Sequence, residues 1–392
     1  MKTKICLISP KFLDYIGGME THAYEFAKWF SNKPDYKLVS VITRKETNDG
    51  IYVAGSTDKY IKTKIIKELT TDFKKDLNII LKNSPKDTKI YFFNSPNWIP
   101  LIKSLKEIRG NSKVIIRSGG TDLVAGWIGS EDDLDGHMEE NKKFIVSIIN
   151  NYVDMLVVNS NFSKQRFLDI GIKGNKMLVV SGGVDCKRYN PLLRERKDNK
   201  IIILHASRFV KCKGIQNILK VFKIVISKFK GDIKLILVGD GPEKLYLEKK
   251  AKELFIMDKV IFTGAQTIED MPNYFNNADI FLHLPITLIR KERGGQFKHV
   301  ESMGRVFCEA SAAGLPSVSF AIGGVPEIII GKKTGFLLEE GDIKSVANKL
   351  VLLIKNKKLR LSMGKESRKM ALKYFDWEKI FKIYGELFIN EK

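Results

Sequence analysis

Two glutamates eight positions apart, Glu301 and Glu309, have a spacing that suits chemistry on a long ligand. Gly304 follows the first and can form a tight turn, and the second begins a small-residue helix that Gly314 and Pro316 would end. Along an unbroken helix the two carboxylates would lie about 12 Å apart, at about 1.5 Å per residue. The acid and base of a glycosidase lie only roughly 5 to 9.5 Å apart. The spacing therefore favours contacts at opposite ends of one ligand, such as the sugar and the ribose of a nucleotide-sugar.

A basic loop, Ser207 to Gly214, follows the first predicted strand of the second half of the chain. Arg208 and Lys213 in this loop provide a guanidinium and an ammonium at the carboxyl end of a strand. Two such cations can hold a diphosphate and stabilise it as it leaves. A solvated basic loop is the alternative that the sequence leaves open.

The paired glycines Gly17 and Gly18 lie between the first predicted strand and a helix expected from about Met19 to Phe30. Glycines at such a turn allow the backbone to approach a phosphate at the N-terminus of the helix. A plain turn without a ligand is an equally good interpretation of these two residues alone.

Composition narrows the class of protein. The chain has 392 residues, enough for two domains, and 44% of them are hydrophobic, which excludes a disordered protein. No apolar run reaches the roughly 18 to 20 residues of a membrane span, so we expect a cytoplasmic protein that is soluble or peripheral on the inner face of the membrane. The cysteines and histidines lack the spacing of a metal site. The net charge of +22 fits nucleic acid, an anionic membrane or anionic small molecules, unless it only reflects a lysine-rich composition.

Continuous apolar strands alternate with amphipathic helical stretches, which predicts parallel sheets buried on both faces. We expect an α/β fold of two Rossmann-like, doubly wound domains facing a cleft. The polar segment 188–199 marks the boundary, giving an N-terminal domain at 1–190, a C-terminal domain at 191–373 and a final helical segment at 374–392. The predicted strands are Ile5–Ser9, Leu38–Thr43, Ile90–Phe93, Val114–Arg117, Leu156–Asn159, Leu178–Ser181, Ile201–His205, Leu235–Val238, Val260–Thr263, Ile280–Leu284 and Ser317–Phe320.

Three further segments have less specific patterns. Residues 59–82 form a basic amphipathic stretch that is best explained as a helix buried in its own domain, with contact to an anionic membrane left open. The basic segment 288–299 is expected to be a loop that closes over phosphates, meets the acceptor or lies free on the surface. Asp133 and Asp135 match an Asp-x-Asp metal pattern, but they lie in an acidic segment rather than at a strand end, which argues against a metal site.

Taken together, these motifs resemble retaining glycosyltransferases of the GT-B fold, in the large group called family four. The resemblance covers nearly the whole chain. Its most specific part is the Glu-x7-Glu pattern of Glu301 and Glu309 with the Ala-x-Gly-x-Pro continuation. The other matching motifs, in the order of the family, are Gly17-Gly18, Gly183-Val-Asp185, Ser207-Arg208 with Lys213-Gly214, and Gly239-Asp-Gly-Pro242.

The resemblance implies roles for individual residues. Glu309 would bind the ribose hydroxyls, Glu301 the hydroxyls of the donor sugar, and Arg208 with Lys213 the diphosphate. Backbone amides of Met303, Gly304 and Arg305, and those of Gly17 and Gly18, would add donors to phosphate oxygens. The final helix, about 376–390, would pack back on the first domain with Trp377 as an anchor.

One departure from the family pattern concerns the donor sugar. Family members often have a histidine in the stretch that here contains Gly119 and Asp122, and Gly119 occupies its position. This replacement indicates a different choice of donor, with Asp122 left as a polar contact.

The function implied is transfer of a sugar from a nucleotide-diphosphate-sugar to a hydroxyl of a glycan or lipid-linked acceptor, with retention of configuration and without a metal or other cofactor. Synthesis of cell-envelope polysaccharide or glycolipid is the expected setting. A sugar-nucleotide epimerase of the same architecture is the alternative. A basic nucleic-acid-binding protein is a weaker one, since we find no aromatic platform or recognition helix among the basic residues.

Overall fold

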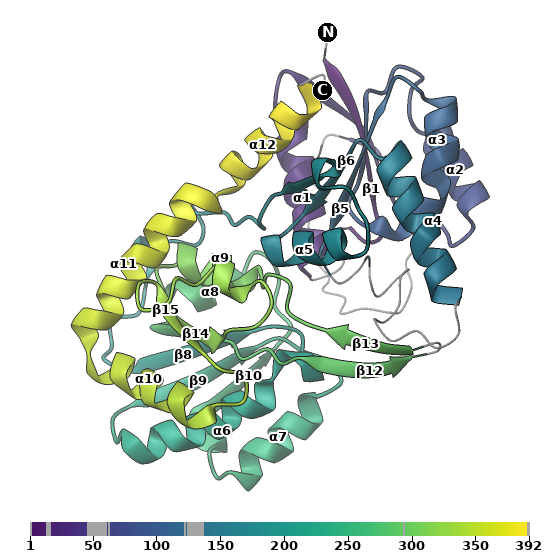
Figure 1. Cartoon of the computed structure of the whole chain (residues 1–392). Helices are drawn as coiled ribbons and strands as arrows, with labels where there is room; N and C mark the ends of the chain where they lie inside the picture. The colour runs from purple at the N-terminus through teal and green to yellow at the C-terminus, as the bar shows by residue number, and fades with distance from the viewer. Residues whose placement is uncertain are drawn as a thin grey trace. The chain divides into compact units, whose positions relative to one another are not determined.

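The computed structural model describes residues 2–12, 17–44, 61, 63–120, 123, 137–292 and 295–389. The chain forms two compact units, each built on its own parallel sheet (Figure 1). The first comprises Met1–Ser181, Ile289–Lys298 and Glu378–Lys392, and the second comprises Gly182–Leu288 and His299–Trp377. The predicted α/β class with two Rossmann-like sheets is confirmed. The units divide after residues 181 and 377, whereas the sequence analysis set its boundaries after 190 and 373.

The first unit has a seven-stranded parallel sheet in the order β3-β2-β1-β4-β5-β6-β7. The order reverses between β1 and β4, as in doubly wound folds. The strands are β1 (Thr3–Ser9), β2 (Tyr36–Arg44), β3 (Ile65–Leu69), β4 (Ile90–Phe93), β5 (Lys113–Ser118), β6 (Met155–Val158) and β7 (Met177–Val179). The helices are α1 (Gly18–Ser31), α2 (Phe73–Lys82), α3 (Ile102–Ile108), α4 (His137–Tyr152), α5 (Asn161–Asp169) and the greater part of α12 (Trp377–Ile389).

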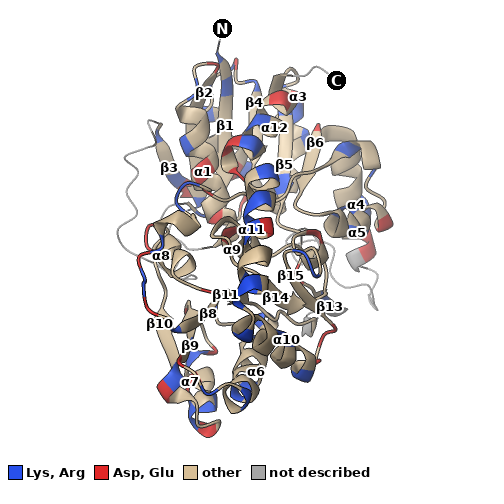
Figure 2. Ribbon diagram, turned by 90° about the vertical axis from the view of Figure 1, so that its left-hand side faces the viewer, with Lys and Arg blue, Asp and Glu red and all other residues tan. Residues whose placement is uncertain are grey.

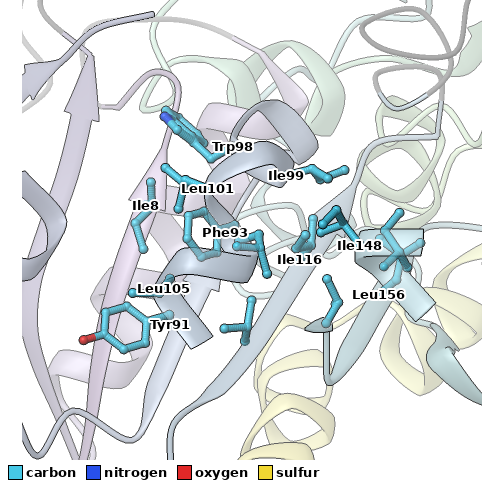
Figure 3. Packing of buried hydrophobic residues seen from close by; sticks show 14 of the residues in the cluster. Ile8, Tyr91, Phe93, Trp98, Ile99, Leu101, Leu105, Ile116, Ile148 and Leu156 are labelled. Carbon is cyan, nitrogen blue, oxygen red and sulfur yellow. The ribbon is translucent and has the colours of Figure 1, made fainter. Parts of the chain in front are cut away.

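The strand β4 shows why the predicted strands read as continuous apolar runs. Tyr91 and Phe93 point to one face of the sheet, where they pack with Trp98 and Ile116 (Figure 3). The indole Nε1 of Trp98, at the edge of this cluster, donates a hydrogen bond of 2.8 Å to the buried Asp76. The intervening Phe92 points to the opposite face and is equally buried. Both faces of the strand are therefore covered, as a parallel sheet requires.

The final helix α12 completes the core on that opposite face. The ring of Phe92 lies 4.4 Å from Phe26 of α1 and 5.4 Å from Tyr384 of α12, measured between ring centroids. Residues from the two ends of the chain thus share one apolar layer. Trp377, at the start of this helix, packs on Gly183 of the second unit, where a Cβ built on Gly183 would lie 2.0 Å from the indole.

The second unit has a six-stranded parallel sheet in the order β10-β9-β8-β11-β14-β15, which reverses between β8 and β11. Its strands are β8 (Ile201–Ala206), β9 (Ile233–Val238), β10 (Val260–Gly264), β11 (Ile280–Leu282), β14 (Ser317–Phe320) and β15 (Gly335–Leu338). Its helices are α6 (Ile215–Lys228), α7 (Lys244–Glu253), α8 (Met271–Asn276), α9 (Val306–Ala312), α10 (Ile343–Lys355) and α11 (Lys357–Tyr374). None of the helices within the described ranges has the length and apolar composition of a membrane span.

Two segments differ from their predicted form. The stretch 59–82 is not one helix, because its described part contains strand β3 and the separate helix α2. Asp72 starts that helix by accepting hydrogen bonds from the amides of Lys74 and Lys75. The segment 288–299 is not an irregular loop but a hairpin of β12 (Leu288–Glu292) and β13 (Gly295–His299).

The polar segment 188–199 belongs to the second unit rather than linking two domains. Arg194 and Arg196 both pair with Asp279, with N–O distances of 3.0 and 2.6 Å. Tyr189 is buried in the core of the same unit. Charge and proline content suggested an exposed linker, but fixed ion pairs hold this segment against the start of β11.

Candidate active site

The candidate site of the second unit lies where β8 and β11 end, at the point where the strand order reverses. Open α/β sheets bind ligands at the carboxyl ends of strands at such a reversal. The loop after β8 contains Arg208 and a short 3-10 helix, Lys211–Lys213. The segment after β11 begins with His283, whose amide donates to the Val318 carbonyl of β14 at 3.2 Å.

The structure brings Lys213 and Glu301 together. The Lys213 Nζ lies 2.5 Å from the Glu301 Oε2, and the two side chains are only 19% and 11% exposed. Burial alone would raise the pKa of the Glu301 carboxyl, but the Lys213 ammonium and the His283 imidazole outweigh it and hold that pKa below its ordinary value. Glu301 is therefore a buried, ionised hydrogen-bond acceptor that already has a cationic partner.

Backbone geometry fixes Glu301 beside the sheet. Gly323, in the loop after β14, has a φ of +52°, and a Cβ at this position would lie 2.0 Å from the Glu301 carbonyl oxygen. The amide of Gly324 donates to that same oxygen at 3.0 Å. Only glycine allows this approach of two backbone segments. The Gly323-Gly324 pair is a positioning element that the sequence analysis did not single out.

Glu309 lies in α9, which begins only at Val306. The helix does not extend back to Glu301, because Gly304 turns the chain with a φ of +75°. The predicted tight turn is therefore present, and the separation of about 12 Å worked for an unbroken helix does not apply.

The Glu309 carboxylate is buried and paired. Its Oε1 lies 2.6 Å from Arg305 Nη1, and its side chain is only 5% exposed. Burial raises the pKa of Glu309, while Arg305 and the hydroxyl of Tyr189 oppose that rise. The guanidinium of Arg305 is thus a contact that sequence analysis missed, since it assigned only the backbone amide of this residue. Met303, next to it, is buried, and its Sδ accepts a 3.0 Å hydrogen bond from the Gly182 amide.

Arg208 differs from Lys213 in its exposure. It is exposed to solvent, and its carbonyl accepts a hydrogen bond from the Val210 amide. Among the described residues no ion pair or side-chain hydrogen bond to its guanidinium is found. Arg208 and Lys213 are thus in the same loop after β8, but Arg208 does not share the ion pair that Lys213 makes with Glu301.

Two buried histidines next to Glu301 were missed altogether. His205 is in β8 and His283 follows β11, and their rings stack with centroids 5.0 Å apart. The His283 Nε2 lies 3.8 Å from the Glu301 Oε2. Burial lowers the pKa of both imidazoles. The signal was available, because a histidine within or directly after an otherwise apolar strand is a polar group that must find a partner.

The remaining predicted residues belong to the first unit. Gly17 and Gly18 start α1, where the Gly17 carbonyl accepts from the amide and the hydroxyl of Thr21. Gly119 follows β5, and its carbonyl accepts a 2.7 Å hydrogen bond from Asn159. Asp122, Asp133 and Asp135 lie outside the described residues.

Part of the chain matches a known protein family. Residues 194–370 match the family model described as glycosyl transferases group 1. The chain is 33% identical over 193 residues to an N-acetyl-alpha-D-glucosaminyl L-malate synthase of Bacillus anthracis, an alignment that covers 49% of this chain and 46% of that protein. Here the chain spans about half the length of its relative.

Two further comparisons cover more of the chain. A GDP-mannose-dependent monoacylated alpha-(1-6)-phosphatidylinositol monomannoside mannosyltransferase of Corynebacterium glutamicum is 28% identical, over 76% of this chain and 74% of that protein. The crystal structure of Anabaena Alr3699/HepE in complex with UDP has a TM-score of 0.74 at 18% identity and covers 99% of both chains. The chain therefore has the GT-B fold that its sequence predicted, and its residues 194–370 resemble the glycosyl transferases group 1 family.

Proposed function

We propose that this protein transfers a hexosyl group from a nucleotide-diphosphate-sugar to a hydroxyl of a glycan or lipid-linked acceptor, with retention of anomeric configuration. The observation that carries the proposal is the meeting of Lys213 and Glu301 at the reversal of strand order in the second sheet. A cation for a diphosphate and an acceptor for sugar hydroxyls lie side by side where such sheets bind ligands.

The donor contacts follow from this geometry. An ammonium has three N–H donors, and Glu301 takes one, so Lys213 can also donate to a diphosphate oxygen. The exposed Arg208 extends from the same loop and supplies a bidentate donor. Glu309, in the next helix, would accept from the ribose hydroxyls. The amides of Met303 to Arg305 would add donors to the phosphate oxygens.

These contacts would act most strongly as the bond between the anomeric carbon and the diphosphate breaks. Negative charge then grows on the departing phosphate, and Lys213 and Arg208 stabilise it. Removing one such donor is expected to raise the barrier by about 2.7 to 4 kcal/mol. The departing phosphate can accept the proton of the acceptor hydroxyl, so the proposal needs neither a dedicated general base nor a metal.

The names of the relatives support the choice of substrates. HepE was crystallised with UDP, and the Corynebacterium relative uses GDP-mannose and a phosphatidylinositol mannoside. We take a UDP- or GDP-sugar as the donor class and a cell-envelope glycolipid or polysaccharide precursor as the acceptor. The net charge of +22 suits a peripheral, cytoplasmic position on an anionic membrane. Co-sedimentation with phosphatidylglycerol vesicles, weakened by salt, is the expected result.

A thermal-shift screen tests the donor site. The wild-type protein, Glu309→Ala and the control Glu253→Ala, which changes an exposed glutamate of α7, are each heated with UDP, GDP, ADP, CDP and their sugars. A nucleotide at 100 times its Kd stabilises by about 2.7 kcal/mol. We expect a shift with one base, lost in Glu309→Ala and kept in Glu253→Ala. No shift with any nucleotide, or a shift unchanged in Glu309→Ala, contradicts the assigned site.

The family match favours neither alternative function. Lysine and arginine occur on elements of both units, among acidic residues (Figure 2), whereas a nucleic-acid site would gather them on one face or along one helix. An epimerase would convert the donor sugar in the absence of any acceptor. Incubation with the donor alone, followed by analysis of the sugar, therefore separates epimerase from transferase.

A further inference from the structure

His283 is a buried polar residue to which neither the family match nor the proposed donor contacts give a role. Its side chain is only 1% exposed, and its Nε2 has no hydrogen-bond partner among the described residues. Buried polar atoms of this kind are rare in native proteins and call for an explanation. The Glu301 Oε2 lies 3.8 Å from this nitrogen.

The neighbours of the two imidazoles assign their hydrogens. The Leu282 carbonyl lies 3.0 Å from His205 Nδ1 and can only accept, so His205 Nδ1 carries a hydrogen. The His205 Nε2 is then an acceptor for the Ser207 hydroxyl, whose single hydrogen goes to this nitrogen at 2.8 Å rather than to the Arg208 carbonyl at 3.0 Å. The His283 Nδ1, 3.3 Å from the protonated His205 Nδ1, must be unprotonated.

A neutral imidazole with a bare Nδ1 carries its hydrogen on Nε2. Burial, which lowers the pKa of His283, favours this neutral form. The N–H of His283 therefore lies on the side of the ring that faces the Glu301 carboxylate. A hydrogen bond needs about 2.7 to 3.2 Å, so a movement of under about 1 Å would close the contact.

Glu301 has a reason to make that movement. In the structure its Oε2 is held by Lys213 at 2.5 Å. On the proposed function, a bound diphosphate draws the same ammonium toward its own negative charge, and this weakens the pair with Glu301 even though Lys213 has N–H donors for both. The buried carboxylate then needs another donor, and His283 Nε2 is the group within reach.

We propose that His283 is a positioning residue, which donates from Nε2 to Glu301 when the donor engages Lys213 and so orients the carboxylate toward the sugar hydroxyls. The inference rests on the proposed function of the site. It assigns to His283 an action through Glu301 alone, with no contact to the nucleotide.

The test compares variants that keep or remove the Nε2 donor. His283→Gln places an amide N–H near the Nε2 position, His283→Asn places it near Nδ1, and His283→Leu has no polar group. The control Phe222→Leu removes buried aromatic packing in α6 of the same unit, a helix that contains none of the proposed site residues. Each protein is titrated with the nucleoside diphosphate and the nucleotide-sugar that the thermal-shift screen selects among the UDP and GDP series, and slow hydrolysis of that donor is followed.

We expect His283→Leu and His283→Asn to lower kcat for donor hydrolysis about 10-fold or more, as loss of a hydrogen bond to a charged group does. The Kd of the nucleoside diphosphate should stay within about two-fold, because the nucleotide does not contact His283. His283→Gln should recover most of the rate, and Phe222→Leu should match the wild type.

Two results would overturn the inference while leaving the proposed function intact. One is wild-type kinetics in His283→Leu and His283→Asn. The other is an equal loss in all three His283 variants together with weaker nucleoside diphosphate binding, which would indicate packing alone. If His283→Leu does not fold, the comparison of Gln with Asn decides. A wild-type protein that binds no nucleotide overturns both the proposed function and the inference.

Discussion

The ion pair between Lys213 and Glu301 can be tested for its contribution to stability. At 2.5 Å and an effective dielectric constant of about 20, Coulomb's law gives about 7 kcal/mol as an upper bound. Loss of hydration by two side chains that are 19% and 11% exposed offsets much of this attraction. Removing one partner of a buried pair costs about 3 to 5 kcal/mol, and partial exposure places this pair at the lower end.

We therefore expect Lys213→Met to lower the free energy of unfolding by about 3 kcal/mol, because it leaves a nearly buried carboxylate without its cation. Glu301→Gln in the same background removes that stranded charge, so the double variant should be more stable than Lys213→Met alone. The coupling energy from the double-mutant cycle should be about 2 to 3 kcal/mol.

Urea unfolding followed by far-UV circular dichroism measures these values. Because the chain has two units, two transitions are fitted, and Phe222→Leu, a core change in α6, identifies the transition of the second unit. The matched control is Lys244→Met, which breaks the more exposed pair with Asp240 at 3.0 Å, where both side chains are 34% exposed, and should cost no more than about 1 kcal/mol. A coupling energy below about 0.5 kcal/mol would refute the reasoning, because the pair would then behave as an exposed one.

Two further predictions use the same unfolding assay. The pKa of Glu301 is lowered on folding, so its contribution is present above about pH 4.5 and lost as pH falls below it; the stability gap between wild type and Glu301→Gln should narrow on acidification. The pKa of Glu309 is raised on folding, so ionisation of this carboxyl costs stability as pH rises through that raised value. The stability gap between wild type and Glu309→Gln should therefore widen on acidification. If the two stability gaps changed with pH in the same direction, the assignment of the two glutamates would be contradicted. Separately, Gly323→Ala should lower the free energy of unfolding by at least about 1 to 2 kcal/mol, because φ is +52° here and the added Cβ would lie 2.0 Å from the Glu301 carbonyl oxygen. Gly331→Ala should be close to neutral, since a Cβ at that position has nothing within 4 Å.

The sequence by itself determined the parts of this protein that depend on local pattern. The buried strands were found because a parallel strand covered on both faces is a continuous apolar run, as at Ile90–Phe93, which matches β4 residue for residue. The final helix was predicted at about 376–390 and extends over Trp377–Ile389. The glutamates, Arg208 and Lys213 were found because their types and their places after strands fit one family pattern.

The sequence pattern gave a wrong prediction where the same spacing of apolar residues fits both a helix and a strand. Ile61, Ile65 and Leu69 are spaced as on a helix, yet Ile65–Leu69 is the edge strand β3. Whether this segment forms a strand or a helix depends on its pairing with β2, which is distant in the chain. The polar segment 188–199 likewise looks like a linker until Asp279 is known to pair with its arginines.

The tertiary structure alone decided which of the candidate groups meet. Lys213 and Glu301 are 88 residues apart, and His205 and His283 are 78 apart. They lie together because β8 and β11 are neighbours in the sheet although β9 and β10 separate them in the chain. Hydrogen-bonded strand order is a property of the assembled sheet, and it determines which charges share a low-dielectric site. The tertiary structure also decides the opposite pKa shifts of the two glutamates. The pKa of Glu301 is lowered because this carboxyl is paired with Lys213, whereas the pKa of Glu309 is raised because burial outweighs its partners.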